Sequence, residues 1–215
     1  MKVKVYVEGG GDSREQHIRC REGFRKLMEK AGFIGAMPGF VAGGGREQTF
    51  DRFKHACTAT RQNEYPVLLV DSEDPLEVQG DSLGPESPVP WAHLKKRDGW
   101  TRPPHANHDQ AQLMTTCMET WILADRDALV RFFGQHLDRN ALLPLDKLEI
   151  RSRHKVQESL QKATARCGKG RGYKKGDRSF KVLAELEPDK LEQVLKHFVR
   201  FKRTLRRRLQ GRDDR

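Results

Sequence analysis

Long apolar runs are missing from this sequence. Of its 215 residues, 36% are hydrophobic and 33% are charged, and no stretch approaches the ~20 consecutive apolar residues of a membrane span. The opening MKVKVYVEGGG contains a short alternating run, where a signal peptide would have a long apolar segment and a cleavage site. We therefore expect a soluble, cytoplasmic protein that does not act at a membrane.

Cysteines are few and scattered. Cys20, Cys57, Cys117 and Cys167 form no C-x-x-C pair and no Cys/His spacing typical of zinc. We expect free thiols, several of them in the core. The phosphate-binding motif GxxxxGK is also missing, so the Gly9–Gly11 run is not a P-loop.

Positive charge is concentrated in the last third of the chain. Residues 1–150 contain 20 Lys and Arg against 22 Asp and Glu, whereas residues 151–215 contain 21 against 8. Clustered Lys and Arg gain free energy by displacing counterions from a phosphate backbone. The charge therefore suggests an anionic partner such as DNA or RNA, although the final RTLRRRLQGRDDR could equally be a solvated tail.

Strand and helix patterns alternate in the first seventy residues. An alternating run at 2–8 ends in glycines, and Ser13 then offers a cap for a helix up to Gly32. A short strand at 40–42 is followed by more glycines and a second helix, and Pro66–Val70 has the apolar run of a strand buried on both faces. This order predicts an α/β fold with a mainly parallel sheet flanked by helices.

The rest of the chain is less regular. The elements expected there are a long loop at 75–110 with one helical turn at 91–94, a strand at 112–118, a helix at 126–137 and an amphipathic helix at 189–209. We divide the chain into a metal-binding α/β domain at 1–150 and a basic segment at 151–215. The second part combines a glycine-rich loop with the C-terminal helix, which we expect to pack on the same domain as an appendage.

Acidic residues follow the predicted strands. They are Glu8 and Asp12 around the first glycine turn, Asp71, Glu73 and Asp74 after the apolar strand, and Glu119 after the later strand. The carboxyl ends of neighbouring parallel strands share one edge, where α/β sheets bind ligands. Converging carboxylates need counter-charge, and Mg²⁺ or Mn²⁺ supplies it. The pattern therefore indicates metal-assisted phosphoryl transfer, although each cluster alone could be a turn or a solvated loop.

These residues resemble a known fold. A strand ending in Val7-Glu8-Gly9, then Asp12, then an apolar strand ending in D-x-[D/E], resembles the Toprim fold of topoisomerases, primases and overcoming-lysogenization-defect (OLD) nucleases. The segments MetGluThrTrpIleLeuAlaAsp at 118–125 and TyrLysLysGly at 173–176 resemble the DUF4276 family of small Toprim-like proteins.

The resemblance implies roles for individual residues. Glu8 would act in acid-base chemistry or metal binding, Asp12 would be the second acid of E-x-x-x-D, and Asp71 would begin the D-x-D pair. The second position of that pair departs from the pattern, because Glu73 and Asp74 both follow. Glu119 would serve a second metal ion. Family members are often encoded beside ATPases and are thought to act in defence against phage, so an ATPase partner is implied.

The basic residues receive two roles. Lys174 or Lys175 is the candidate catalytic cation that stabilises developing charge on the scissile phosphate. The candidates for nucleic-acid contact are Arg166, Lys169, Arg171 and Arg178 in a flexible glycine-rich loop, and Arg203, Arg206 and Arg207 on the final helix. That helix is expected to leave Arg200 and Lys202 partly outward as well.

Two functional interpretations remain open. A nuclease is the preferred enzyme, because a topoisomerase needs a nucleophilic tyrosine on a separate domain and a primase a nucleotide-binding partner domain. The alternative is a non-catalytic Toprim-like subunit that docks to an ATPase or to nucleic acid. In either case Trp121 is expected to pack in the core.

Overall fold

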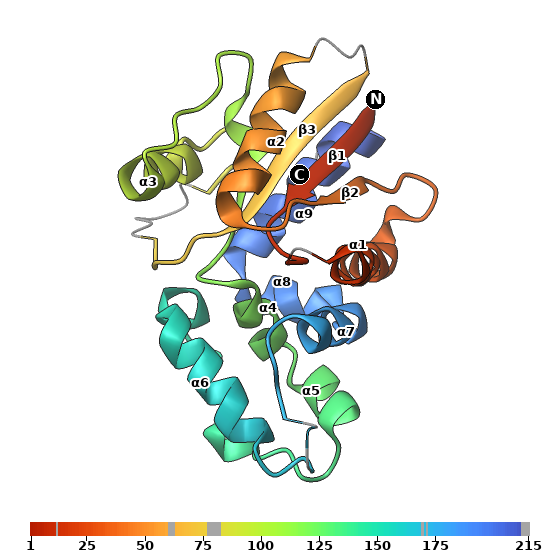
Figure 1. The fold of residues 1–215 in the computed structure, drawn as a ribbon, viewed down its shortest axis with the longest axis vertical. Coiled ribbons are helices and arrows are strands. Elements are labelled where there is room, and N and C mark those ends of the chain that lie inside the picture. Colours follow the sequence, from red (N-terminus) through yellow and green to blue (C-terminus); the bar gives the residue numbers. More distant parts are fainter. Residues whose placement is uncertain (12, 60–62, 77–82, 169, 171, 212–215) are drawn as a thin grey trace.

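A four-stranded parallel sheet forms the centre of the upper half of the molecule (Figure 1). The structure is a computed structural model that describes residues 1–11, 13–59, 63–76, 83–168, 170 and 172–211. The strands are β1 (Lys2–Val7), β2 (Gly39–Ala42), β3 (Glu64–Asp71) and β4 (Ala111–Met114). Their order is β2-β1-β3-β4, so the α/β prediction with a parallel sheet is confirmed.

The α-helices follow the strands in chain order. They are α1 (Arg14–Met28), α2 (Arg46–Thr58), α3 (Val89–Asp98), α4 (Met118–Ala124), α5 (Arg126–Phe133), α6 (Arg153–Thr164), α7 (Asp177–Glu185), α8 (Pro188–Val194) and α9 (Lys196–Gln210). A π-helical turn (Glu29–Phe33) extends α1, and short 3-10 turns lie at His108–Gln110, Arg139–Ala141 and Leu148–Ile150. Among the described residues, no helix has both the length and the apolar composition needed to cross a membrane.

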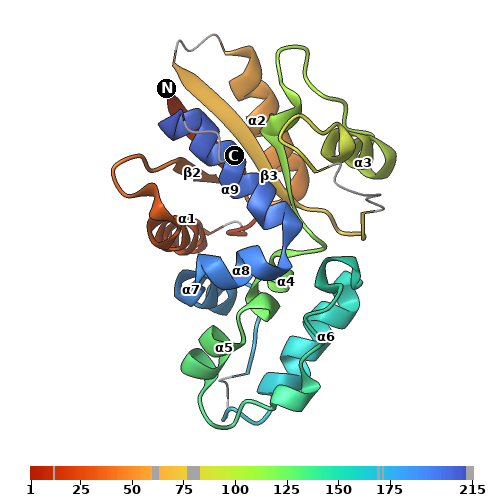
Figure 2. The same ribbon diagram turned by 180° about the vertical axis from the view of Figure 1, so that it is seen from behind.

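Helices cover both faces of the sheet. Successive side chains of a strand point to opposite faces, so Leu69 of β3 joins the larger core with α1 and α9, whereas Leu68 and Val70 join a second core with α2 and α3. Figure 1 shows α2 in front of β3, and Figure 2 shows α9 on the other face. The two tryptophans of the predicted loop, Trp91 and Trp100, are buried in the second core.

A second group of helices, α4 to α8, lies beyond the carboxyl ends of the strands (Figures 1 and 2). The larger core continues into this group, from Val3 of β1 through Trp121 of α4 and Val156 of α6 to Leu205 of α9. Residues before and after position 150 therefore share one core. Trp121 is fully buried between Phe24 and two phenylalanines of α9, which confirms the prediction that it packs in the core.

Several predicted boundaries were wrong. The strand expected at 112–118 is only β4 (Ala111–Met114), and the next apolar residues form α4, in which all seven side chains are buried. A short apolar run suits a buried helix as well as a strand. The single turn expected at 91–94 is the ten-residue α3, and the helix expected at 126–137 ends at Phe133 before Gly134.

The basic C-terminal segment also differs from the prediction. The expected glycine-rich loop is bounded by α6 and α7 and contains a buried Tyr173, and the final helix is divided at Leu195 into α8 and α9. Arg200 and Lys202 were expected partly outward but are buried. Contacts with other segments explain this burial. The Arg200 guanidinium donates hydrogen bonds to the carbonyl oxygens of Gly84, Pro85, His108 and Ala111, and Lys202 pairs with Glu192 of α8.

Candidate metal centre at the carboxyl edge of the sheet

Glu8 and Asp71 meet where two adjacent strands end. Val7 of β1 is paired with Leu69 of β3, and Glu8 follows β1 directly. The backbone N–H of Asp71 donates to Oε2 of Glu8 over 3.2 Å. The two carboxylates thus lie together at the edge predicted from the strand-then-acid pattern.

The side chain of Asp71 is buried from solvent. It is 5% exposed, and its Oδ1 accepts a hydrogen bond of 2.9 Å from the backbone N–H of Met118. Burial, followed by the negative charges of Glu8 and Glu119, raises the pKa of Asp71 well above its ordinary value, and Lys175 and the Met118 N–H oppose this shift. A carboxylate in such surroundings gains most from a nearby cation.

Glu73, rather than Asp74, joins these two acids. Ligand oxygens of Glu8, Asp71 and Glu73 all lie within 4.8 Å of one another. Glu73 adopts a left-handed backbone conformation with φ of 66°, and its N–H donates to Thr116 O over 2.8 Å. The Asp74 side chain is 68% exposed and pairs with Arg97.

Glu119 approaches from the helical half of the molecule. It lies in the first turn of α4 and is fully buried. Its Oε1 accepts a hydrogen bond of 2.7 Å from the Tyr173 hydroxyl, which is also 2.8 Å from Ser179 Oγ. Its Oε2 is buried and has no hydrogen-bond partner among the described residues.

The phenol and the serine that support Glu119 were not predicted as site residues. Tyr173 belongs to the TyrLysLysGly segment on which the family resemblance rests, and no functional role was expected for it. Ser179 lies in the first turn of α7. The Ser179 hydroxyl also accepts the N–H of Gly176 over 3.1 Å. Burial and the charge of Glu119 raise the pKa of Tyr173 well above its usual value, so the phenol stays a hydrogen-bond donor.

Arg46 is a further residue that sequence reasoning missed. It begins α2, and its Nη1 donates to Glu8 Oε2 (3.1 Å) and to Asp71 O (2.5 Å). Asp98 holds the other side of the guanidinium through two hydrogen bonds of 3.0 and 2.7 Å, and Trp100 lies beneath it. The sequence contained one signal for Arg46. Both Arg46 and Glu8 adjoin a run of three glycines at the end of a strand: Glu8 comes just before the first run, and Arg46 comes just after the second.

Three of the acids, Glu8, Asp71 and Glu119, line a cavity of about 320 Å³, and Glu73 lies outside its lining. The residues that line it are Glu8, Gly9, Gly10, Gly11, Gln16, Gly44, Asp71, Met118, Glu119, Lys175, Gly176, Ser179 and Phe180. Both candidate catalytic lysines are exposed, but only Lys175 is in this lining and Lys174 is outside it. Asp12, the remaining predicted metal ligand, lies outside the described residues.

The predicted nucleic-acid contacts are spread over the molecule. Arg166 and Arg203 are exposed. Arg178 donates hydrogen bonds to the carbonyl oxygens of Gly170 and Gly172. Its guanidinium group therefore stabilises the loop that precedes α7. Lys169 and Arg171 belong to the part of the chain that the structure leaves undescribed.

The arginines at the end of α9 lie at the far edge of the sheet from Asp71. Arg207 pairs with the buried Asp109 over 2.8 Å, and Asp109 accepts a hydrogen bond from Tyr65, near the start of β3. Six residues of strand, about 20 Å, separate Tyr65 from Asp71. Arg206 occupies the same turn of α9 and is partly exposed.

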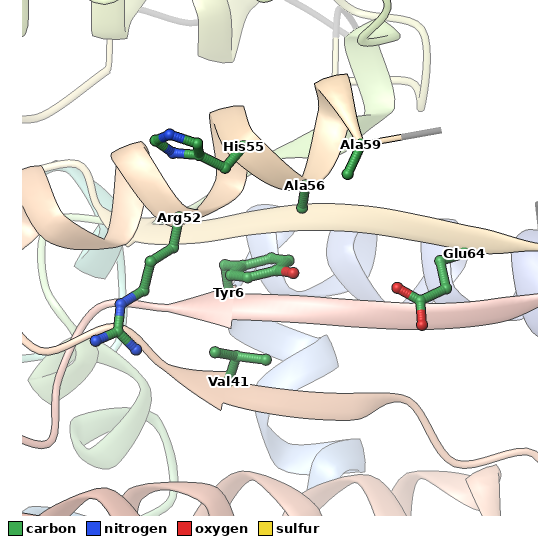
Figure 3. A pocket seen from close by; sticks show the side chains of 7 residues that line it. All are labelled: Tyr6, Val41, Arg52, His55, Ala56, Ala59 and Glu64. Atoms are coloured by element: carbon green, nitrogen blue, oxygen red, sulfur yellow. The ribbon is translucent and has the colours of Figure 1, made fainter. Parts of the chain in front are cut away.

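A second cavity of about 470 Å³ lies between α2 and the sheet (Figure 3). Its lining residues are Tyr6, Val41, Arg52, His55, Ala56, Ala59 and Glu64. Figure 3 shows Tyr6 and Val41 on neighbouring strands beneath the helix. Glu64 is the single acid in this lining, and it pairs with Lys4 over 2.8 Å, so this cavity lacks the donors for a divalent cation.

The residues at the carboxyl edge suit Mg²⁺ or Mn²⁺. Their donor atoms are carboxylate oxygens, which hard divalent cations prefer. One specific observation favours a cation: the Glu119 Oε2 is buried and no residue in the described ranges forms a hydrogen bond with it, and a buried carboxylate oxygen is costly unless it is paired.

A parallel α/β sheet with an acidic cavity at its carboxyl edge defines the class of this protein. The chain belongs to the DUF4276 family, described as a domain of unknown function, whose model matches residues 7–206. The match includes every described residue of the candidate centre. Comparisons with curated proteins and with solved structures found no match.

Proposed function

We propose that this protein is a Mg²⁺- or Mn²⁺-dependent nuclease-type hydrolase that cleaves phosphodiester bonds in DNA or RNA. Two observations carry the proposal: Glu8, Asp71, Glu119 and Lys175 line one cavity, and the Glu119 Oε2 is buried with no hydrogen-bond partner among the described residues. Three carboxylates and one cation around a solvent-connected cavity suit a phosphate group better than a neutral ligand.

Each residue has a distinct role in this proposal. Glu8, Asp71 and Glu73, whose ligand oxygens lie within 4.8 Å of one another, would hold one divalent cation, and Glu119 would serve a second. Such a cation would polarise the phosphate and stabilise the attacking and leaving oxygens. Arg46 fixes the orientation of Glu8, and Lys175 faces developing negative charge on the phosphate. The buried Tyr173 keeps Glu119 in place.

The proposal extends, on resemblance, to a relationship with the Toprim fold and the nuclease domain of OLD nucleases. The proposed relationship is supported by the location of two acids, because Glu8 follows β1 and Asp71 ends β3. An ATPase partner and a role in phage defence are proposed on the same basis.

The direct test is incubation of the purified protein with plasmid, linear DNA and RNA, with EDTA, Mg²⁺ or Mn²⁺. We expect metal-dependent cleavage of at least one substrate, which is lost in folded Glu8→Gln and Asp71→Asn variants. Cleavage that persists in EDTA or in both variants would contradict the proposal, because it would come from a different site or from a contaminant.

A lysine pair provides a matched control for the same assay. Lys175 lines the cavity and Lys174 does not, so Lys175→Ala should lower turnover roughly 100-fold, the usual effect of losing one electrostatic contact to the transition state. Lys174→Ala should remain close to wild type. Equal effects of the two changes would remove Lys175 from the mechanism.

One observation favours a second candidate, a non-catalytic subunit that docks to an ATPase or to nucleic acid. Glu8 and Glu73 are already ion-paired with Arg46 and Arg153, as they would be in a purely structural network. In that case the protein would bind nucleic acid or a partner, and no metal ion would produce cleavage.

A further inference from the structure

Glu73 is shared by two arginines from different helices. Arg153 of α6 forms an ion pair with Glu73 Oε2, and Arg97 of α3 lies 3.8 Å from the same oxygen. The two arginine side chains are 44% and 30% exposed, whereas that of Glu73 is 10% exposed. Solvent therefore reaches the guanidinium groups more readily than the acid between them.

The arginines compete with a metal ion for Glu73. Two ligands about 2.1 Å from one Mg²⁺ are at most about 4.2 Å apart, so oxygens within 4.8 Å need only a small side-chain shift to share an ion. A divalent cation beside Glu8, Asp71 and Glu73 would be repelled by the two guanidinium groups. While the arginines hold Glu73, a cation at this site would therefore be bound more weakly.

Arg97 and Arg153 are suited to an anion that could replace Glu73. Arginine binds phosphate oxygens through two parallel hydrogen bonds, which gives it a strong preference for such groups. Arg97 is anchored by Asp98, and it also pairs with the exposed Asp74 over 3.2 Å. It would therefore stay in place when Glu73 leaves.

We propose that Arg97 and Arg153 form a binding site for a backbone phosphate of nucleic acid, and that phosphate bound there releases Glu73 to the divalent cation. This inference rests on the proposed function. Its consequence is positive coupling between substrate and metal, and such coupling is reciprocal, because each ligand raises the affinity of the other by the same factor.

The first test is titration of Mn²⁺ into wild type, Arg153→Gln and Lys155→Gln by calorimetry, without nucleic acid. Lys155 is exposed on the same helix and serves as the charge-matched control. Removing Arg153 should free Glu73, so Arg153→Gln should bind Mn²⁺ about tenfold more tightly, within the usual range of coupling between sites. Lys155→Gln should match wild type.

The second test uses the wild-type protein alone. Mn²⁺ is titrated in the presence of a phosphorothioate-linked DNA oligonucleotide, which keeps the backbone charge and resists cleavage, or of an uncharged methylphosphonate oligonucleotide. Titrations without protein correct for Mn²⁺ bound by the oligonucleotide itself. The charged oligonucleotide should raise Mn²⁺ affinity about tenfold, the uncharged one should not, and Arg153→Gln should show little gain from either.

Each outcome decides the inference. Equal or weaker Mn²⁺ binding by Arg153→Gln, or equal effects of the two oligonucleotides, would overturn it and leave the metal-dependent nuclease standing. No Mn²⁺ binding by any of the proteins would overturn both proposals. If Arg153→Gln does not fold, as judged from its melting curve, the oligonucleotide comparison on wild type decides.

Discussion

Glu119 is fully buried, yet only one of its two carboxylate oxygens has a hydrogen-bond donor in the part of the chain that the structure describes. Burying an ionised group without partners costs several kcal/mol. The Tyr173 hydroxyl is therefore the main support of this acid when no metal is bound, and a cation would provide the second.

Tyr173→Phe removes that support. We expect the free energy of unfolding in EDTA to fall by about 1–3 kcal/mol, the usual cost of leaving a buried group unsatisfied. In saturating Mn²⁺ the loss should be smaller, because the cation then pairs with Glu119. Urea unfolding with and without Mn²⁺ measures both values.

Tyr65→Phe is the matched control. Tyr65 also donates to a buried acid, Asp109, over 2.5 Å, but at the other edge of the sheet. Its stability loss should be the same in EDTA and in Mn²⁺. If Mn²⁺ changes both losses alike, Glu119 is not a ligand.

His197 gives the protein a specific acid sensitivity. Burial, followed by the charges of Arg200 and His93, lowers the pKa of His197 to about 3. In the unfolded chain the value is about 6.5, so the unfolded state takes up the proton first. Native stability should decline as pH falls below about 6.5, by about 2 kcal/mol from this residue between pH 7 and pH 5.

Urea unfolding of wild type and His197→Gln at pH 7, 6 and 5 measures this contribution as a difference. The difference is needed because Glu149 and Asp71, whose pKa values are raised, act in the opposite direction as pH falls. Parallel pH profiles for the two proteins would show that His197 is not the sensitive group.

Among the elements, α1 and α7 pack closely at Gly23. A Cβ placed there would lie 2.7 Å from the backbone oxygen of Phe180. Because α7 also carries Ser179 and Phe180 into the lining of the cavity, the spacing of these two helices helps to set the geometry of the candidate metal centre.

Gly23→Ala should therefore reverse the usual effect of alanine in a helix. In an open helix interior the change would stabilise by roughly 0.5–1 kcal/mol, but here α7 must shift, and we expect a loss of about 1–3 kcal/mol together with weaker Mn²⁺ binding. Thermal and urea unfolding and calorimetry test this. Gly45→Ala, whose Cβ would meet nothing within 4 Å, should lose only the preference for glycine over alanine at the N-cap of α2, roughly 0.5–1 kcal/mol, and should leave Mn²⁺ binding unchanged.

The elements also show how far sequence reasoning reaches. The units from β1 to β3 were predictable, because the glycine runs and the Ser13 cap mark where strands end and helices begin. Glu8 and Asp71 came with them, since parallel strands bring their carboxyl ends together. Arg46 and Tyr173 were not predicted, because their roles depend on contacts between distant segments. The α4 boundary was missed because a buried helix and a strand share one apolar pattern.

At the scale of the whole molecule, we expect the acidic centre to limit stability and a bound metal ion to relieve this limit. Mg²⁺ or Mn²⁺ at 100 times its dissociation constant should add about 2.7 kcal/mol, or roughly 5–10 °C in Tm for a chain of this size. Asp71→Asn removes a proposed metal ligand and a buried acid near two other acids. Its metal-free Tm should exceed that of wild type, and the metal response should disappear.

Differential scanning calorimetry in EDTA and at millimolar metal measures these shifts. A wild-type melting curve that metal leaves unchanged would argue strongly against a metal centre. A shift of equal size in Asp71→Asn would place the bound ion elsewhere.

The position of α9 has a consequence for biosynthesis. This helix packs against β1 and β4 and covers the sheet face of Val5 and Leu69 with Phe198 and Phe201. At about 5–20 residues per second, the ribosome needs roughly 5–20 s to make residues 115–210 after the last strand is complete. Until then the apolar face of a nascent parallel sheet lacks its cover, so the growing chain should be a substrate for chaperones that bind exposed hydrophobic surface.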